Sequence, residues 1–185
     1  MVVINRSLKI ATISILTATA ITIRITKNWT IGAFQFINIA LIFGFIGSIL
    51  LDPLSGGLVA LLSQLISDLF IWPGPWTPIT SFTAFATAML GSLSKRIKYE
   101  EFQVIILYLC VFFYDIITST LTYLISGLSP INSLVVGLIG LFLPVEGGWM
   151  FGVGPITEFT TSFLTVMLMK ILKRNGFNTM QFIQS

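Results

Sequence analysis

The sequence predicts an all-α integral membrane protein: a single transmembrane domain over residues 1–185, with six transmembrane helices, cytoplasmic termini and a long outer loop before the last helix. Composition is the first observation behind this prediction, because the 185 residues are 55% hydrophobic and only 9% charged. A typical soluble domain has about a quarter of its residues charged. The second observation is a series of long apolar runs, and the third is an uneven distribution of Lys and Arg between them. No linker or low-complexity stretch divides the chain.

A helix crosses the hydrocarbon layer in about 20 apolar residues. On this criterion we expect transmembrane spans at 7–26, 32–51, 55–72, 78–94, 102–126 and 152–172. An even number of spans places both ends of the chain on the same side of the membrane.

The distribution of Lys and Arg indicates which side of the membrane holds the termini. Of the ten Lys and Arg residues, only Arg24 and Lys27 fall on the side opposite the termini. The others share the side of the termini: Arg6, Lys9, Lys95, Arg96, Lys98, Lys170, Lys173 and Arg174. Because Lys and Arg are enriched in cytoplasmic loops, we expect a multi-pass protein of the cell membrane with cytoplasmic N- and C-termini.

Two segments could alter the number of spans. The apolar stretch 131–143 has about a dozen residues, which favours a re-entrant or interfacial piece over a crossing. The N-terminal run is similar to a secretory signal peptide, with Ala-x-Ala at 18–20. Its apolar residues continue to Ile25, so we expect a retained helix.

The segment WPGPWTP at 72–78 forms a rigid aromatic corner on the outer side, since proline fixes φ and removes a hydrogen-bond donor. Trp72 and Trp76 lie in it, and Trp29 and Trp149 are also expected at the outer face. Tryptophan is common at membrane interfaces, so an aromatic belt is one interpretation. The cytoplasmic side has no tryptophan, which favours an outward-facing aromatic binding site as the other.

Acidic residues inside spans are costly and often functional. Asp68, Glu146 and Glu158 are expected near the outer side, and Asp115 lies about fourteen residues into its span, near the bilayer midplane. Asp115 would be protonated, hydrogen-bonded or paired with a cationic ligand. Polar stripes on the third, fifth and sixth spans are either interhelical hydrogen bonds or the walls of a pocket. The candidate substrate-binding residues are Trp72, Trp76, Asp68, Asp115, Glu146, Trp149 and Glu158.

The first span carries small residues at helical spacing on one face: Ser7, Ala11, Ser14 and Ala18. Small residues let a second helix approach closely, either within the protein's own bundle or in a partner.

Together these features resemble the substrate-binding S components of energy-coupling factor (ECF) transporters. The resemblance rests on the small-residue face of the first span, the glycine-rich hairpin 44–68 with its Asp52-Pro53-x-x-Gly56 turn, and the long outer loop. It implies a non-enzymatic subunit for vitamin uptake, which captures a small water-soluble vitamin or related micronutrient with high affinity at the outer membrane face. Its partners would be a transmembrane T subunit, which docks on the first helix, and two ATPase subunits of an ABC importer. The family's docking motif is Ala-x-x-x-Ala, which this chain replaces by Ser7-x-x-x-Ala11 and Ser14-x-x-x-Ala18.

The residue inventory limits the chemistry. The sequence has no GxxxxGK[ST] phosphate-binding loop, no histidine and one cysteine, Cys110, so we expect no ATPase activity, no cofactor and no zinc, nickel, copper or haem site. We expect the lipid bilayer and a small molecule as partners, and no nucleic acid. Tryptophans beside unpaired carboxylates favour a cationic ring, such as a thiamine-like or pyrimidine compound. A phosphate-rich ligand would require Arg24 or Lys27 to turn inward.

The sequence is also compatible with two other functions, each of which would use the intramembrane acids differently. A membrane hydrolase would have to use an acid pair such as Asp115 and Glu158. A channel or an autonomous proton-coupled transporter would use the intramembrane acid Asp115.

Overall fold

The computed structural model describes residues 6–32, 35–142, 145–147, 150–152 and 154–176. Helices dominate this part of the chain, as expected, and a short antiparallel hairpin pairs β1 (Val145–Gly147) with β2 (Met150–Gly152). The helices are α1 (Arg6–Ile31), α2 (Ile39–Leu50), α3 (Pro53–Ile71), α4 (Trp76–Gly91), the 3₁₀ helix η1 (Ser92–Arg96), α5 (Glu100–Ile125), α6 (Pro130–Phe142) and α7 (Gly154–Arg174).

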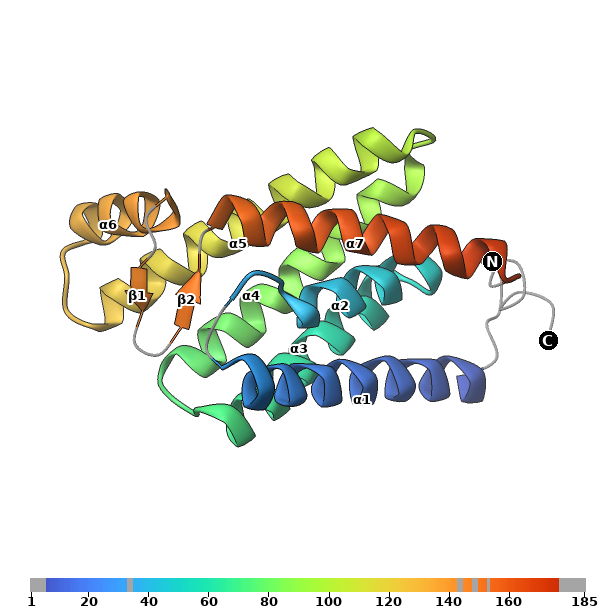
Figure 1. The fold of residues 1–185 in the computed structure, drawn as a ribbon, viewed down its shortest axis with the longest axis horizontal. Helices are drawn as coiled ribbons and strands as arrows, with labels where there is room; N and C mark the ends of the chain where they lie inside the picture. Colours follow the sequence, from blue (N-terminus) through green and yellow to red (C-terminus); the bar gives the residue numbers. More distant parts are fainter. Residues whose placement is uncertain (1–5, 33–34, 143–144, 148–149, 153, 177–185) are drawn as a thin grey trace.

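The helices α1 to α5 and α7 run back and forth along the long axis of the molecule, whereas α6 and the hairpin lie at one end (Figure 1). The start of α1 and the end of α7 lie at the opposite end, which we call the terminal end. Two ion pairs join elements there: Lys9 Nζ lies 2.8 Å from Asp52 Oδ2, and Lys170 Nζ lies 2.9 Å from Glu100 Oε2. The other end, with the α1–α2 loop, the α3–α4 corner and α6, is the distal end.

Helix α2 is the centre of the bundle. It packs against α1, α3, α4 and α7, and every one of its residues except Phe43 is buried. A helix that is apolar all round belongs in such a position. Its glycines bring α3 very close, because a Cβ added at Gly47 would lie 3.1 Å from the Cα of Gly56. The glycine-rich hairpin noted in the sequence is therefore a tight helix pair.

The second expected span, 32–51, is longer than the helix that forms there. Helix α2 begins only at Ile39, after Asn38, whose side-chain Oδ1 accepts a hydrogen bond from Leu41 N at 3.1 Å. Its 12 residues make a helix about 18 Å long, shorter than the hydrocarbon layer of about 30 Å. The neighbouring helices α1, with 26 residues, and α3, with 19, extend beyond it at the distal end.

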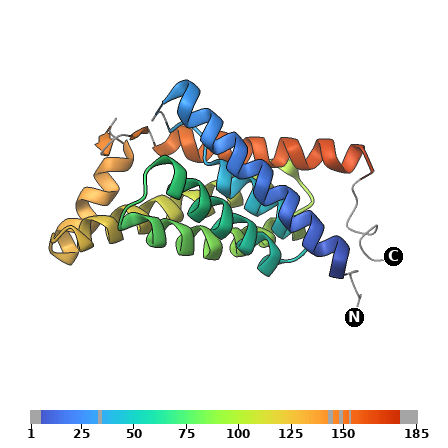
Figure 2. The ribbon, with the colours of Figure 1, turned by 90° about the horizontal axis from the view of Figure 1, so that it is seen from below.

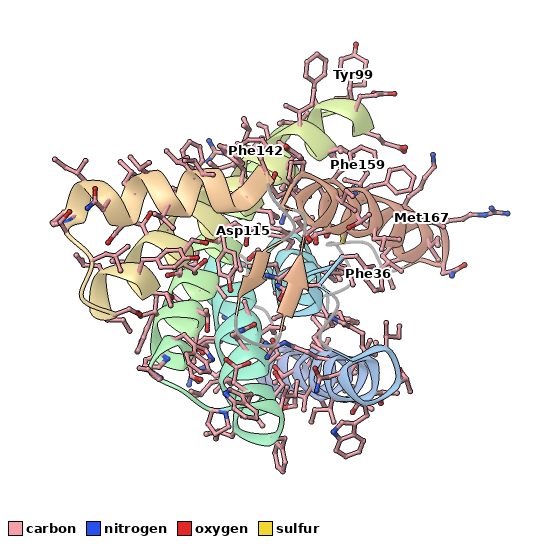
Figure 3. The ribbon with its side chains drawn as sticks, turned by 60° about the vertical axis from the view of Figure 1, so that its left-hand side comes forward. Phe36, Tyr99, Asp115, Phe142, Phe159 and Met167 are labelled. Atoms are coloured by element: carbon pink, nitrogen blue, oxygen red, sulfur yellow. The ribbon has the colours of Figure 1, made fainter. Side chains whose placement is uncertain are left out.

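The bundle presents its apolar side chains outward. On α7, Phe159, Phe163 and Met167 are about half exposed (Phe159 and Met167 are labelled in Figure 3), whereas Glu158 and Thr161 on the inner side are 0% exposed. Helices α1, α3 and α5 are long and apolar enough to cross a membrane. An apolar outer surface around polar inner faces is compatible with insertion into a bilayer.

The segment 131–143, expected to be re-entrant or interfacial, corresponds to α6. This helix of 13 residues lies at the distal end and packs mainly on α5 (Figures 1 and 2). Ile131, Leu134 and Phe142 on it are exposed, whereas Ser133 and Gly137 are buried.

Candidate ligand-binding site

A polar pocket opens at the distal end, above the N-terminus of α2. Its empty volume is about 420 Å³. It exists because α2 begins late: α1 and α3 form walls that continue past the start of α2, and the α1–α2 loop closes over part of the space. The lining residues are Arg24, Lys27, Asn28, Gln35, Ile37, Asn38, Ile39, Gln64 and Ile71.

The floor of the pocket is the first turn of α2, with Ile37, Asn38 and Ile39. The backbone N–H groups of a first turn have no intrahelical partners, and the helix dipole adds partial positive charge there. Asn38 N already donates to Thr161 Oγ1 at 2.8 Å, which ties this floor to α7. The arrangement favours negative charge or carbonyl oxygens in a bound molecule.

One wall is a buried ion pair. Arg24 Nη2 lies 2.6 Å from Asp68 Oδ1, and the two side chains are only 14% and 5% exposed. Arg24 also donates to Gln64 O at 3.1 Å and to Ser67 Oγ. The expectation that Asp68 is an unpaired carboxylate awaiting a cationic ligand is therefore wrong, because α1 supplies its counter-charge. Arg24 does turn inward, which is the condition set above for a phosphate-rich ligand, but its charge is already paired with Asp68.

Lys27 lies one turn further along α1 and brings a second positive charge to the pocket. Its Nζ is 5.7 Å from the centroid of the Phe36 ring in the α1–α2 loop, a cation–π contact that holds the side chain across the pocket. No ion pair of Lys27 occurs among the described residues. With Asn28, Gln35 and Gln64 nearby, the lining offers positive charge and amide groups.

A second polar group lies between α5 and α7. Asp115 is partly buried and Glu158 is 0% exposed, and their carboxyl groups are close enough to interact electrostatically. Figure 3 shows Asp115 in the interior of the bundle. Tyr114 links this pair to the pocket: it is buried, lies against Asn38, and interacts with both Asp115 and the Arg24–Asp68 pair. Sequence reasoning predicted correctly that Asp115 and Glu158 face inward.

The aromatic corner does not line the pocket. Trp72 ends α3 and is 51% exposed, and the Trp76 ring packs over the backbone of Gly74 at the start of α4. Glu146 belongs to β1, where it pairs with Phe151, and Trp149 lies outside the described residues. The predicted substrate-binding residues thus divide into separate groups: the corner, the ion-paired Asp68 and the Asp115–Glu158 pair.

The small-residue face of α1 points away from the bundle. Ser7, Ala11, Ser14 and Ala18 are all exposed, whereas the buried residues of α1 are Thr17 and Ala20. Among the described residues, this face therefore lies on the outside of the bundle.

Sequence reasoning missed most of the pocket. Gln35 and Asn38 are not among the predicted site residues because residues 32–51 are expected to form one uninterrupted span, and Lys27 and Asn28 fall in the short loop before that span. The run of polar residues in KNWTIGAFQFIN (27–38) was the available signal, since five polar side chains in so short a segment argue against a lipid-embedded helix. Gln64 lies on the polar stripe of the third span but is not among the predicted substrate-binding residues.

No protein-family model, no curated protein and no solved structure matches this chain.

Proposed function

We propose that this chain is the substrate-binding S component of an ECF-type importer, which captures a small water-soluble micronutrient from outside the cell. In this proposal α1 to α5 and α7 make six passes, with α2 as a short buried pass, and the terminal end faces the cytoplasm. The observation that carries the proposal is the polar pocket at the distal end, the end without the eight clustered basic residues.

Two further features support a binding subunit. Most of the basic residues lie on elements of the terminal end, so the positive-inside tendency directs the pocket outward. The small-residue face of α1, made of Ser7, Ala11, Ser14 and Ala18, is exposed, and small residues of this kind let the helices of a partner T subunit approach closely.

The pocket chemistry changes the expected ligand. Lys27, the first turn of α2 and the amides favour a compound with a carboxylate or another anionic group beside hydrogen-bonding atoms. The cationic ring expected from the sequence depended on unpaired carboxylates, and Asp68 is paired with Arg24. The proposed substrate is therefore a small organic anion of the vitamin type.

The proposal is tested by purifying the protein in mild detergent from cells grown in rich medium and identifying released small molecules by mass spectrometry. We expect a stoichiometric anionic compound with the wild type. Lys27→Ala should weaken its binding about 10- to 100-fold, the cost of losing a hydrogen bond to a charged group. Lys95→Ala, an exposed lysine of η1 at the terminal end, is the matched control and should bind normally. Equal affinity in both variants would contradict the assignment of this pocket.

A second candidate function follows from the Asp115–Glu158 pair. Buried carboxyl groups in transporters often move protons or ions, so an autonomous coupled transporter is the alternative. Reconstitution of the chain alone in liposomes separates the two: uptake of the released compound without ATPase partners would favour the autonomous transporter, and uptake only with them would favour the S component.

A further inference from the structure

We propose that Asp115 and Glu158, with the main-chain oxygen of Leu141 and the hydroxyl of Tyr108, form a binding site for a sodium ion. This site lies between α5, α6 and α7 and is distinct from the pocket lined by Lys27. It adds a second ligand to the proposed function and does not depend on it.

The main evidence for this site is the buried carboxyl group of Glu158. The side chain is 0% exposed, and neither Oε1 nor Oε2 has a hydrogen-bond partner among the described residues. The Oδ2 atom of Asp115 is likewise buried without a partner there. The Tyr108 hydroxyl lies near Glu158 but not in hydrogen-bonding geometry. Buried carboxyl oxygens are normally satisfied, so these three atoms are available as ligands of a cation.

The end of α6 contributes a further oxygen. A Cβ added at Gly154 would lie 2.8 Å from Leu141 O and 3.3 Å from Glu158 Oε1, so both oxygens flank the same glycine. Leu141 is the penultimate residue of α6, and the last four carbonyls of a helix have no intrahelical donor. These carbonyls carry partial negative charge, which attracts a cation. Helix C-terminal carbonyls beside acidic side chains are a recurring way to hold sodium in membrane transporters.

The surrounding charges leave the pair uncompensated. No ion pair of Asp115 or Glu158 occurs among the described residues, and Arg24, which interacts electrostatically with the neighbouring Tyr114, is already bonded to Asp68. Two carboxylates close together in a low-dielectric interior repel strongly, and a counter-ion between them removes most of that cost.

The donor set indicates which ion fits. All the donors are oxygens, which suit hard cations rather than zinc or copper. No group of three or more His, Cys, Asp or Glu side chains converges within the part of the chain that the structure describes. Calcium takes six to eight oxygen ligands and magnesium retains several waters, which a pair of carboxyls enclosed at Glu158 does not favour. Glu158 is closed to the surface and Asp115 is only partly exposed, and so enclosed a position suits a small ion rather than an organic amine.

The test measures thermal unfolding of the purified protein in NaCl against choline chloride at constant pH and ionic strength. We expect a saturable rise of the unfolding temperature with sodium, because an ion that binds only the folded state stabilises it. Asp115→Asn and Glu158→Gln should each abolish the sodium-dependent rise. Glu101→Gln, an exposed acid at the start of α5, is the control and should keep it. Equilibrium binding of radioactive sodium to the same four proteins gives a direct readout.

A further variant keeps both carboxyls. Gly154→Ala places a methyl group against Leu141 O and Glu158 Oε1, so sodium binding should fall at least tenfold even if the charge variants fail to fold. The proposal is overturned if sodium and choline give the same unfolding temperature, if the rise survives in Gly154→Ala and both charge variants, or if magnesium alone produces it. A pair that is neutralised by a proton instead would show a pH-dependent unfolding temperature without any sodium response, which also overturns it.

Discussion

At the scale of single residues, Asp52 combines a helix cap with an ion pair at the terminal end. Its Oδ1 accepts a hydrogen bond from Ser55 N at 3.0 Å, and its Oδ2 accepts one from Ser55 Oγ at 2.7 Å and lies 2.8 Å from Lys9 Nζ. Partial burial alone would raise the pKa of Asp52. The hydrogen bonds from Lys9 and Ser55, with the charge of Lys9, outweigh burial and hold the pKa below its usual value.

The sign of this shift predicts a pH dependence. A carboxyl whose pKa is lower in the folded state adds stability above its unfolded pKa of about 3.9 and loses it as the pH falls through the folded value. Asp52→Asn keeps a good cap but removes the ion pair, so it should lower the unfolding temperature at pH 7, and its difference from the wild type should shrink as the pH falls below about 3.9. Asp52→Ala also loses the cap, at a cost of about 0.5–2 kcal/mol.

Thermal unfolding followed by intrinsic fluorescence between pH 3 and pH 7 measures both effects. Lys9→Met should behave like Asp52→Asn, because it breaks the same pair from the other side. A constant difference between wild type and Asp52→Asn at every pH would refute the linkage.

Individual residues were predictable where local spacing decides their position. Asp52 before Pro53 reads as a turn, and Asp115 and Glu158 fall on the polar faces of their own helices. The Arg24–Asp68 pair was not predictable, because it depends on how α1 and α3 are rotated about their axes relative to each other. That rotation is set by tertiary packing and not by either helix alone.

At the scale of elements, the exposed face of α1 leads to a prediction about assembly. Ala11→Leu combined with Ala18→Leu enlarges two exposed positions, so the isolated protein should fold and bind its ligand normally. Association with the proposed T subunit should be lost, since a leucine side chain prevents the close approach that small residues allow. Co-purification with a tagged T subunit and size-exclusion chromatography of the variant alone measure the two outcomes.

The opposite face of α1 provides the control. Ala20 is 0% exposed, so Ala20→Leu should overpack the core and destabilise the fold, typically by about 1–3 kcal/mol. If the Ala11 and Ala18 variant unfolds as Ala20→Leu does, the face is structural and the docking proposal fails.

Helix boundaries show how far the sequence predicts the elements. Long apolar runs identified the positions of α1, α3, α5 and α7, because hydrophobicity and length are local properties. The late start of α2 at Ile39 was missed, since the preceding segment is apolar enough to continue a span by composition. The Asn38 cap and the hydrogen bond from Asn38 N to Thr161 Oγ1 on α7 fix the start of α2 at this point. The second of these is a long-range interaction. The pocket above α2 was therefore missed, although the polar residues within 27–38 were a signal for it in the sequence.

At the scale of the whole molecule, the fold places two chemically different ends on one bundle. The terminal end collects the ion pairs of Lys9 and Lys170 and most of the basic residues, and the distal end holds the pocket and α6. The start of α1 and the end of α7 share one end (Figure 1). That placement agrees with an even number of passes, in which α6 does not cross.

This arrangement predicts which loops face the outside of the cell. In a Cys110→Ala background, Ser129→Cys in the exposed α5–α6 loop should react with a membrane-impermeant maleimide on intact cells. Lys98→Cys, in the exposed segment between η1 and α5, should react only after the cells are permeabilised, because it belongs to the basic terminal end. The reverse pattern would place the pocket in the cytoplasm and exclude capture from outside. Labelling of both positions on intact cells would mean that α5 does not span the membrane, and the six-pass arrangement would then be wrong.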